Sequence, residues 1–123
     1  MRFLLNIGLN VGATTAISAE VARQILIANH LLPVDDGVVH ASDTEPTLVI
    51  AVEPLMLRNP LLVMQSLKAV AVDLQQDCIA VYRPKTGGGS LVGPKAAEWG
   101  PFNPEFFILP NGTRLSGPAA QAA

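Results

Sequence analysis

The sequence has little charge and almost no cysteine, and both shortages exclude classes of protein. Only 15% of its 123 residues are charged, and eight scattered Lys and Arg stand against ten Asp and Glu, for a net charge of −2. Such a chain offers no basic stripe to a phosphate backbone, so we expect no binding to nucleic acid. The single cysteine, Cys78, excludes an internal disulfide and a cysteine-rich zinc site, which makes a reducing cytoplasm the natural compartment.

Long apolar runs are also missing. No run approaches the roughly 20 residues that a membrane-spanning helix needs, so we expect no membrane association. The first 19 residues faintly resemble a signal peptide, but Asn6, Gly8 and Asn10 interrupt the apolar run, and we expect no cleaved leader. Half of all residues are nevertheless apolar, which lets one compact domain bury a core without a disulfide, a metal or a cofactor.

The order of periodic segments predicts the fold. The segments are an alternating strand over 2–10, an amphipathic helix over 18–30, two short strands around a polar turn over 38–53, a helix over 59–76 and a strand over 78–83. This is the βαββαβ order of a ferredoxin-like domain. We therefore predict an α+β, ferredoxin-like βαββαβ sandwich.

Local signals support these elements. Ser18 is a good N-cap for the first helix, and Asn59 followed by Pro60 is a strong start for the second. The run over 47–52 is apolar on both faces, which is typical of a central strand. The face of the first strand that we expect beneath the helices carries Phe3, Leu5, Ile7 and Leu9. The residues that we expect on the solvent side of the second helix are Gln65, Lys68 and Asp73.

Beyond Arg83 the chain changes character. Turn residues over 84–89 precede a short strand over 90–92 and one helical turn over 95–99. Asn111-Gly112 then predicts a hairpin that joins 106–109 to 113–116. We expect one domain over 1–116, with a core over 2–83, a C-terminal β-hairpin extension over 84–116 that extends or covers the sheet, and a flexible tail over 117–123.

A polar turn gathers His40, Ser42, Asp43, Thr44 and Glu45 in a chain that is otherwise poor in charge. A histidine beside carboxylates can act as an acid–base pair or bind a metal. A solvated hairpin turn has the same composition, and we favour that interpretation. A zinc site would need further His or Cys ligands; because the chain offers only two more such residues, we expect no metal.

The glycine loop over 8–15 lies between a strand and a helix N-terminus, where backbone amides can hold an anion. It matches no nucleotide-binding motif, and we favour a simple connection. If a small ligand site or an enzyme exists, it joins this loop to the polar turn, with the residues His40, Asp43, Glu45, Asn10, Gly12 and Thr14. Because no catalytic signature is present and Cys78 reads as a small buried hydrophobe, we name no catalytic residue.

Four of the six aromatic residues lie within 99–107, between two prolines. Aromatic side chains on a stiff segment can anchor a partner protein, or they can form a plug that caps one edge of the sheet. We expect Phe106 and Phe107 to be a plug, while both roles stay open for Trp99 and Phe102. The residues that we predict to contact a partner are Trp99, Phe102, Asn103, Asp43 and Glu45.

Three stretches resemble small proteins of bacterial phages and other mobile elements: Asp77–Tyr82, Ser42–Thr47 and Trp99–Pro104. The resemblance covers most of the chain and implies no activity. It implies a small accessory protein that binds a host protein. The sequence therefore predicts a protein–protein interaction module that forms a homodimer, with the ligand site or enzyme as the alternative and nucleic-acid binding third.

Overall fold

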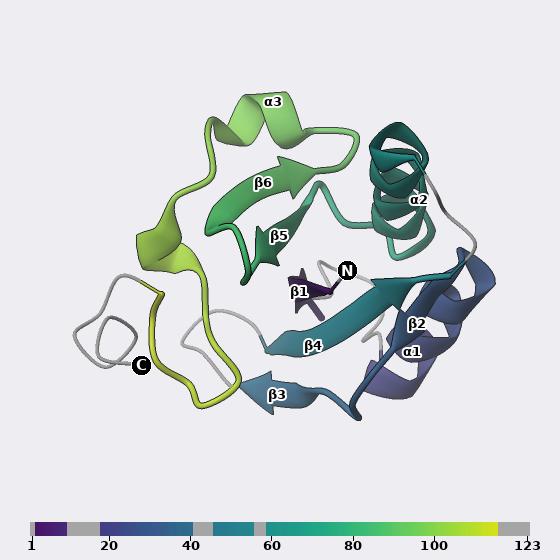
Figure 1. Cartoon of the computed structure of the whole chain (residues 1–123), viewed down its shortest axis with the longest axis horizontal. Helices are drawn as coiled ribbons and strands as arrows, with labels where there is room; N and C mark the ends of the chain where they lie inside the picture. Colours follow the sequence, from purple (N-terminus) through teal and green to yellow (C-terminus); the bar gives the residue numbers. More distant parts are fainter. Residues whose placement is uncertain (1, 10–17, 41–45, 56–58, 116–123) are drawn as a thin grey trace.

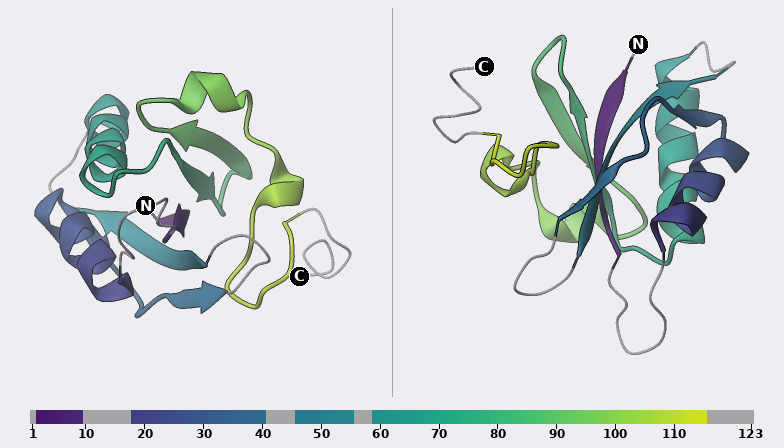
Figure 2. Two further views of the ribbon diagram at one scale, coloured as in Figure 1. Left: turned by 180° about the vertical axis from the view of Figure 1, so that it is seen from behind. Right: turned by 90° about the horizontal axis from the view of Figure 1, so that it is seen from below.

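A computed structural model describes residues 2–9, 18–40, 46–55 and 59–115. These residues form an α+β fold with three layers, in which a six-stranded antiparallel sheet has the two long helices on one face and a C-terminal segment on the other (Figure 1 and Figure 2). The α+β character predicted from the sequence is confirmed. None of the helices in the described part of the chain has the length and apolar character that a membrane span requires.

The elements follow the predicted order closely. They are β1 (Phe3–Gly8), α1 (Ala19–Ala28), β2 (Leu31–Pro33), β3 (Val38–His40), β4 (Thr47–Pro54), α2 (Pro60–Asp73), β5 (Ile79–Arg83), β6 (Gly88–Val92), α3 (Ala96–Trp99) and the 3-10 helix η1 (Pro104–Phe106).

The sheet has the strand order β2-β4-β1-β5-β6, and β3 also pairs with β4. Strand β1 is central and antiparallel to both neighbours, so Leu5 lies opposite Ile50 in β4 and Val81 in β5. The specific ferredoxin-like topology is not established, because the sheet has more strands and its strand order differs. Two features account for the difference: β6 adds a hairpin partner to β5, and two short strands share the outer edge of β4.

A bulge separates β2 from β3 along that edge. The Asp35 carboxylate accepts hydrogen bonds from the backbone N–H of Gly37 at 2.9 Å and of Ala51 at 3.5 Å. Gly37 has φ +76°, and a Cβ there would lie 2.8 Å from the Leu48 side chain, so the bulge requires glycine. Strand β2 was not predicted, because Pro33 argues against a strand; an edge position tolerates it.

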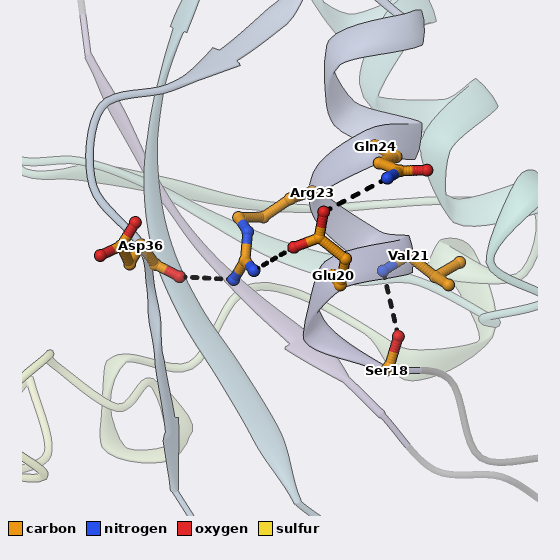
Figure 3. Close-up of polar contacts among 6 residues, drawn as sticks. All are labelled: Ser18, Glu20, Val21, Arg23, Gln24 and Asp36. Atoms are coloured by element: carbon orange, nitrogen blue, oxygen red, sulfur yellow. Dashed lines mark hydrogen bonds and ion pairs between the residues drawn. The ribbon is translucent and has the colours of Figure 1, made fainter.

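Helix α1 begins as the sequence indicates and is tied to the bulge. The Ser18 hydroxyl accepts a hydrogen bond from the Val21 N–H at 3.1 Å, and Arg23 donates to the backbone oxygen of Asp36 at 2.8 Å (Figure 3). Glu20 accepts hydrogen bonds from Arg23 and Gln24, which lower the pKa of its carboxyl. The predicted cap of α2 is also confirmed, since Asn59 accepts from the Leu61 N–H at 2.8 Å.

Two apolar clusters lie on opposite faces of the sheet. The helix-side cluster is the larger and packs β1, β4 and β5 against α1 and α2; its fully buried members include Leu5, Ile7, Leu26 and Leu67. The predicted inner face of β1 is confirmed. The smaller cluster lies on the opposite face, beneath the C-terminal segment 99–115 (the strap), and is built on Leu4, Val49 and Phe107; it is called the strap-side cluster. Because both faces are covered, β4 is apolar on both, as predicted.

Candidate interaction surface

The strap, residues 99–115, runs across the sheet face opposite the helices (Figure 2). Phe107 is 1% exposed and packs against Leu4 and Val49. The ring of Tyr82 is stacked with that of Phe102, with 6.5 Å between centroids and 11° between planes. The strap thus covers one face of the sheet, and not the edge that the aromatic plug was predicted to cap.

Asn6 holds the strap in register. Its Nδ2 donates to the backbone oxygen of Ile108 at 2.9 Å, and its Oδ1 accepts from the Ile108 N–H at 2.8 Å. Among the described residues, Asn6 is the one polar side chain that is buried. The two bonds satisfy its amide and let the side chain act as a short piece of neighbouring strand.

The predicted C-terminal β-hairpin is reduced to a turn with one isolated bridge, Ile108–Arg114. The Asn111 carboxamide oxygen accepts from the Thr113 N–H at 3.0 Å and from its hydroxyl at 2.7 Å. Backbone bonds continue on both sides of this turn, from the Leu109 N–H to the Thr113 oxygen at 2.8 Å and from the Leu115 N–H to the Phe107 oxygen at 2.9 Å, but the described residues of the predicted strands, 106–109 and 113–115, form no regular ladder. The short strand predicted over 90–92 does form, as part of β6, which pairs with β5 in a hairpin.

The aromatic residues of the strap divide into anchors and exposed rings. Phe107 is buried as predicted and Phe102 is half-buried, whereas Trp99 is 63% and Phe106 72% exposed. The prediction that Phe106 belongs to the plug is therefore wrong. Asn103 is exposed but already engaged, since its side chain accepts from the Glu105 N–H at 3.0 Å and caps η1.

His40 connects the sheet edge to the strap. Its Nε2 donates to the backbone oxygen of Pro110 at 3.0 Å, and a Cβ at Gly112 would lie 3.4 Å from the imidazole ring. This role is structural. The other residues of the alternative ligand site lie outside the described residues, namely Asp43, Glu45, Asn10, Gly12 and Thr14.

Nucleophilic and metal chemistry have little support in the described part of the chain. No three His, Cys, Asp or Glu side chains gather there closely enough to hold a metal ion. Cys78 is half-buried just before β5, and burial, followed by the charge of Asp77, raises the pKa of its thiol. A raised pKa leaves less thiolate at neutral pH, which opposes reactivity.

The outer face of α2 is a surface that the sequence prediction missed. Gln65, Lys68 and Asp73 are exposed as predicted, but large apolar side chains share that exposure: Leu61, Leu62, Met64 and Val72. The sequence does carry a sign of this surface, because apolar residues lie on nearly all sides of α2 rather than along one stripe.

A scan against protein-family models found no match, and neither did searches of curated proteins and of solved structures. The function is therefore argued from the exposed surfaces.

Proposed function

We propose that the protein is a non-enzymatic module that binds another protein chain through the outer side of its strap. The observation that carries the proposal is the exposure of Trp99 and Phe106, at 63% and 72%. Exposed aromatic residues are enriched at the centres of protein interfaces, because they supply large apolar area from few rotatable bonds.

The position of the strap strengthens this proposal. Phe102, which lies between Trp99 and Phe106 in the sequence, and Phe107, which follows Phe106, both pack on the sheet. Their ring centroids are 5.7 Å apart. Asn6 adds two hydrogen bonds to the backbone of Ile108, which lies two residues after Phe106. A braced backbone loses little freedom on binding, which leaves more of the contact energy for affinity.

The partner that we propose first is a second copy of the chain, as the simplest symmetric assembly. The resemblance to proteins of mobile elements extends the proposal to an accessory protein that acts on a host protein in the cytoplasm. A ligand site or an enzyme at the polar turn has less support, because the His40 Nε2 already donates to the Pro110 carbonyl of the strap.

We also infer a distant relation between residues 2–83 and ferredoxin-like domains, despite the different strand order. Its support is the position of β1 between β4 and β5, antiparallel to both, with α1 and α2 packed on one face.

The test compares two doubly substituted variants by analytical ultracentrifugation over a range of concentrations. Trp99→Ala/Phe106→Ala removes the exposed rings of the strap, and Leu61→Ala/Leu62→Ala removes two exposed apolar side chains from α2. We expect the wild type and the α2 variant to dimerise, and the strap variant to dimerise at least about thirtyfold more weakly, the cost of losing a hot spot of about 2 kcal/mol.

Trp99 is the chain's single tryptophan, so its fluorescence should shift to shorter wavelength as the dimer forms. A host partner is tested by immobilising wild type and strap variant and comparing what each retains. A wild type that stays monomeric, together with equal capture by both proteins, would contradict the proposal.

A further inference from the structure

A groove remains open at the end of the sheet face that the strap does not cover. It has a volume of about 580 Å³, and its lining includes Arg2, Leu4, Ala51, Glu53, Pro84 and Lys85. That volume lies within the roughly 300–1,000 Å³ of small-molecule sites. In Figure 2 the start of β1 lies beside the β5–β6 turn at this end of the molecule.

Part of the lining of the groove is apolar. Leu4 and Ala51 lie directly opposite each other in β1 and β4. Both belong to the strap-side cluster that Phe107 covers, so the groove continues an apolar surface that is already partly shielded from water. Pro84, which follows β5, adds a further apolar residue to the lining. An apolar body placed here would extend the cluster and release water.

Two cationic side chains also line the groove. The Arg2 Nε donates to a Glu53 carboxylate oxygen at 3.2 Å, which orients the guanidinium, and its terminal amino groups form no hydrogen bond or ion pair with another described residue. Lys85, in the turn between β5 and β6, forms no ion pair within the described residues. Two cations and one carboxylate leave the groove with a net positive charge, although the whole chain has a net charge of −2.

We propose that this groove binds a small organic acid, with its apolar body on Leu4 and Ala51 and its carboxylate between Arg2 and Lys85. Charge complementarity supports an anion, and the apolar part of the lining favours an organic acid over an inorganic ion. This site is separate from the protein-binding surface proposed above, and each proposal can fail without the other.

The test is an NMR titration of the full-length, ¹⁵N-labelled chain with 3-phenylpropionate. We expect saturable shifts at the amides of Leu4, Ala51 and Lys85. The uncharged 3-phenylpropanamide and the small anion acetate should bind at least about fivefold more weakly, because each lacks one half of the recognition.

Matched charge variants locate the anion site. Lys85→Gln should weaken 3-phenylpropionate binding about two- to fivefold, as expected for one exposed ion pair. Lys68→Gln makes the same change of charge on the exposed side of α2 and should leave binding unchanged. Shifts scattered over the whole surface, equal binding of the amide, or equal loss in both variants would overturn the proposal. Trp99→Ala/Phe106→Ala should titrate like the wild type.

Discussion

At the scale of single residues, Asn6 is the polar side chain with the least exposure to solvent among the described residues. It is 8% exposed in the central strand, where an amide that lost its partners would cost free energy. Both of its polar groups are paired with one residue, Ile108, about a hundred positions away. The side chain therefore specifies where the strap docks as well as stabilising it.

Asn6→Ala should lower the free energy of unfolding by about 2–3 kcal/mol, because it leaves the Ile108 N–H and carbonyl unpaired beneath the strap. Urea unfolding followed by circular dichroism measures the loss. Asn29→Ala is the matched control: its main bond, at 2.8 Å, reaches the Ile25 carbonyl within the same helix region, so about 1 kcal/mol or less is expected. Equal losses in the two variants would show that Asn6 does not dock the strap.

Cys78 should react slowly with iodoacetamide in the folded protein, with a rate–pH midpoint above that of the urea-unfolded chain. Burial is the larger cause of its raised pKa and Asp77 the smaller, so Asp77→Asn should move the midpoint only part of the way back. The folded state favours the neutral thiol. Its contribution to stability is therefore complete below the unfolded pKa and is lost as the pH rises through the folded pKa. Identical profiles for folded and unfolded chains would contradict this.

At the scale of elements, the strap and the β5–β6 hairpin depend on each other. A Cβ at Gly89 would lie 2.3 Å from the Phe102 ring, so the absence of a side chain in β6 is what admits that ring. Phe102 in turn stacks on Tyr82 of β5. The β5–β6 hairpin therefore provides the surface on which Phe102 of the strap packs.

Gly89→Ala should destabilise the protein by about 2 kcal/mol, because it displaces Phe102 from its seat. Gly87→Ala, in the turn between β5 and β6, is the comparison: φ is +78° there and nothing lies within 4 Å, so only the left-handed backbone penalty of about 1 kcal/mol applies. In a Phe102→Ala background the cost of Gly89→Ala should largely disappear. Thermal unfolding of the single and double variants measures this coupling, and additive losses would show that the two sites are independent.

At the scale of the whole molecule, the three layers are unequally held. The helix-side cluster joins residues of five strands to two helices, whereas the strap-side cluster has, among the described residues, only three buried side chains: Leu4, Val49 and Phe107. Local opening follows the thinner contacts, so the strap should open before the sheet does.

Native-state hydrogen exchange should show this order. The amides of Ile108 and Leu115, which bond to Asn6 and to the Phe107 carbonyl, should exchange through a partial opening of lower free energy than the amides of central β1. Asn6→Ala should accelerate the strap amides more than those of β1. If strap and β1 exchanged with the same free energy in both proteins, the layers would unfold as one unit.

Part of the candidate surface could be predicted and part could not. The burial of Phe107 was predicted, and the exposure of Trp99 agrees with one of the two roles that the sequence left open for it. Phe106 and Phe107 are adjacent and chemically identical, so no local rule distinguishes the exposed ring from the buried one. Only the packing of residue 107 against Leu4 and Val49 does so.

Apart from β2, the sequence by itself determined the elements up to Arg83, because their causes are local: the two-residue period of β1, the caps at Ser18 and Asn59, and the two-faced apolar run of β4. It did not determine the strand order or the path of the strap. Those depend on contacts between distant residues, of which Asn6 with Ile108 is the clearest. A lone asparagine in an alternating strand gives no sign of its partner, and only the folded chain brings the two together.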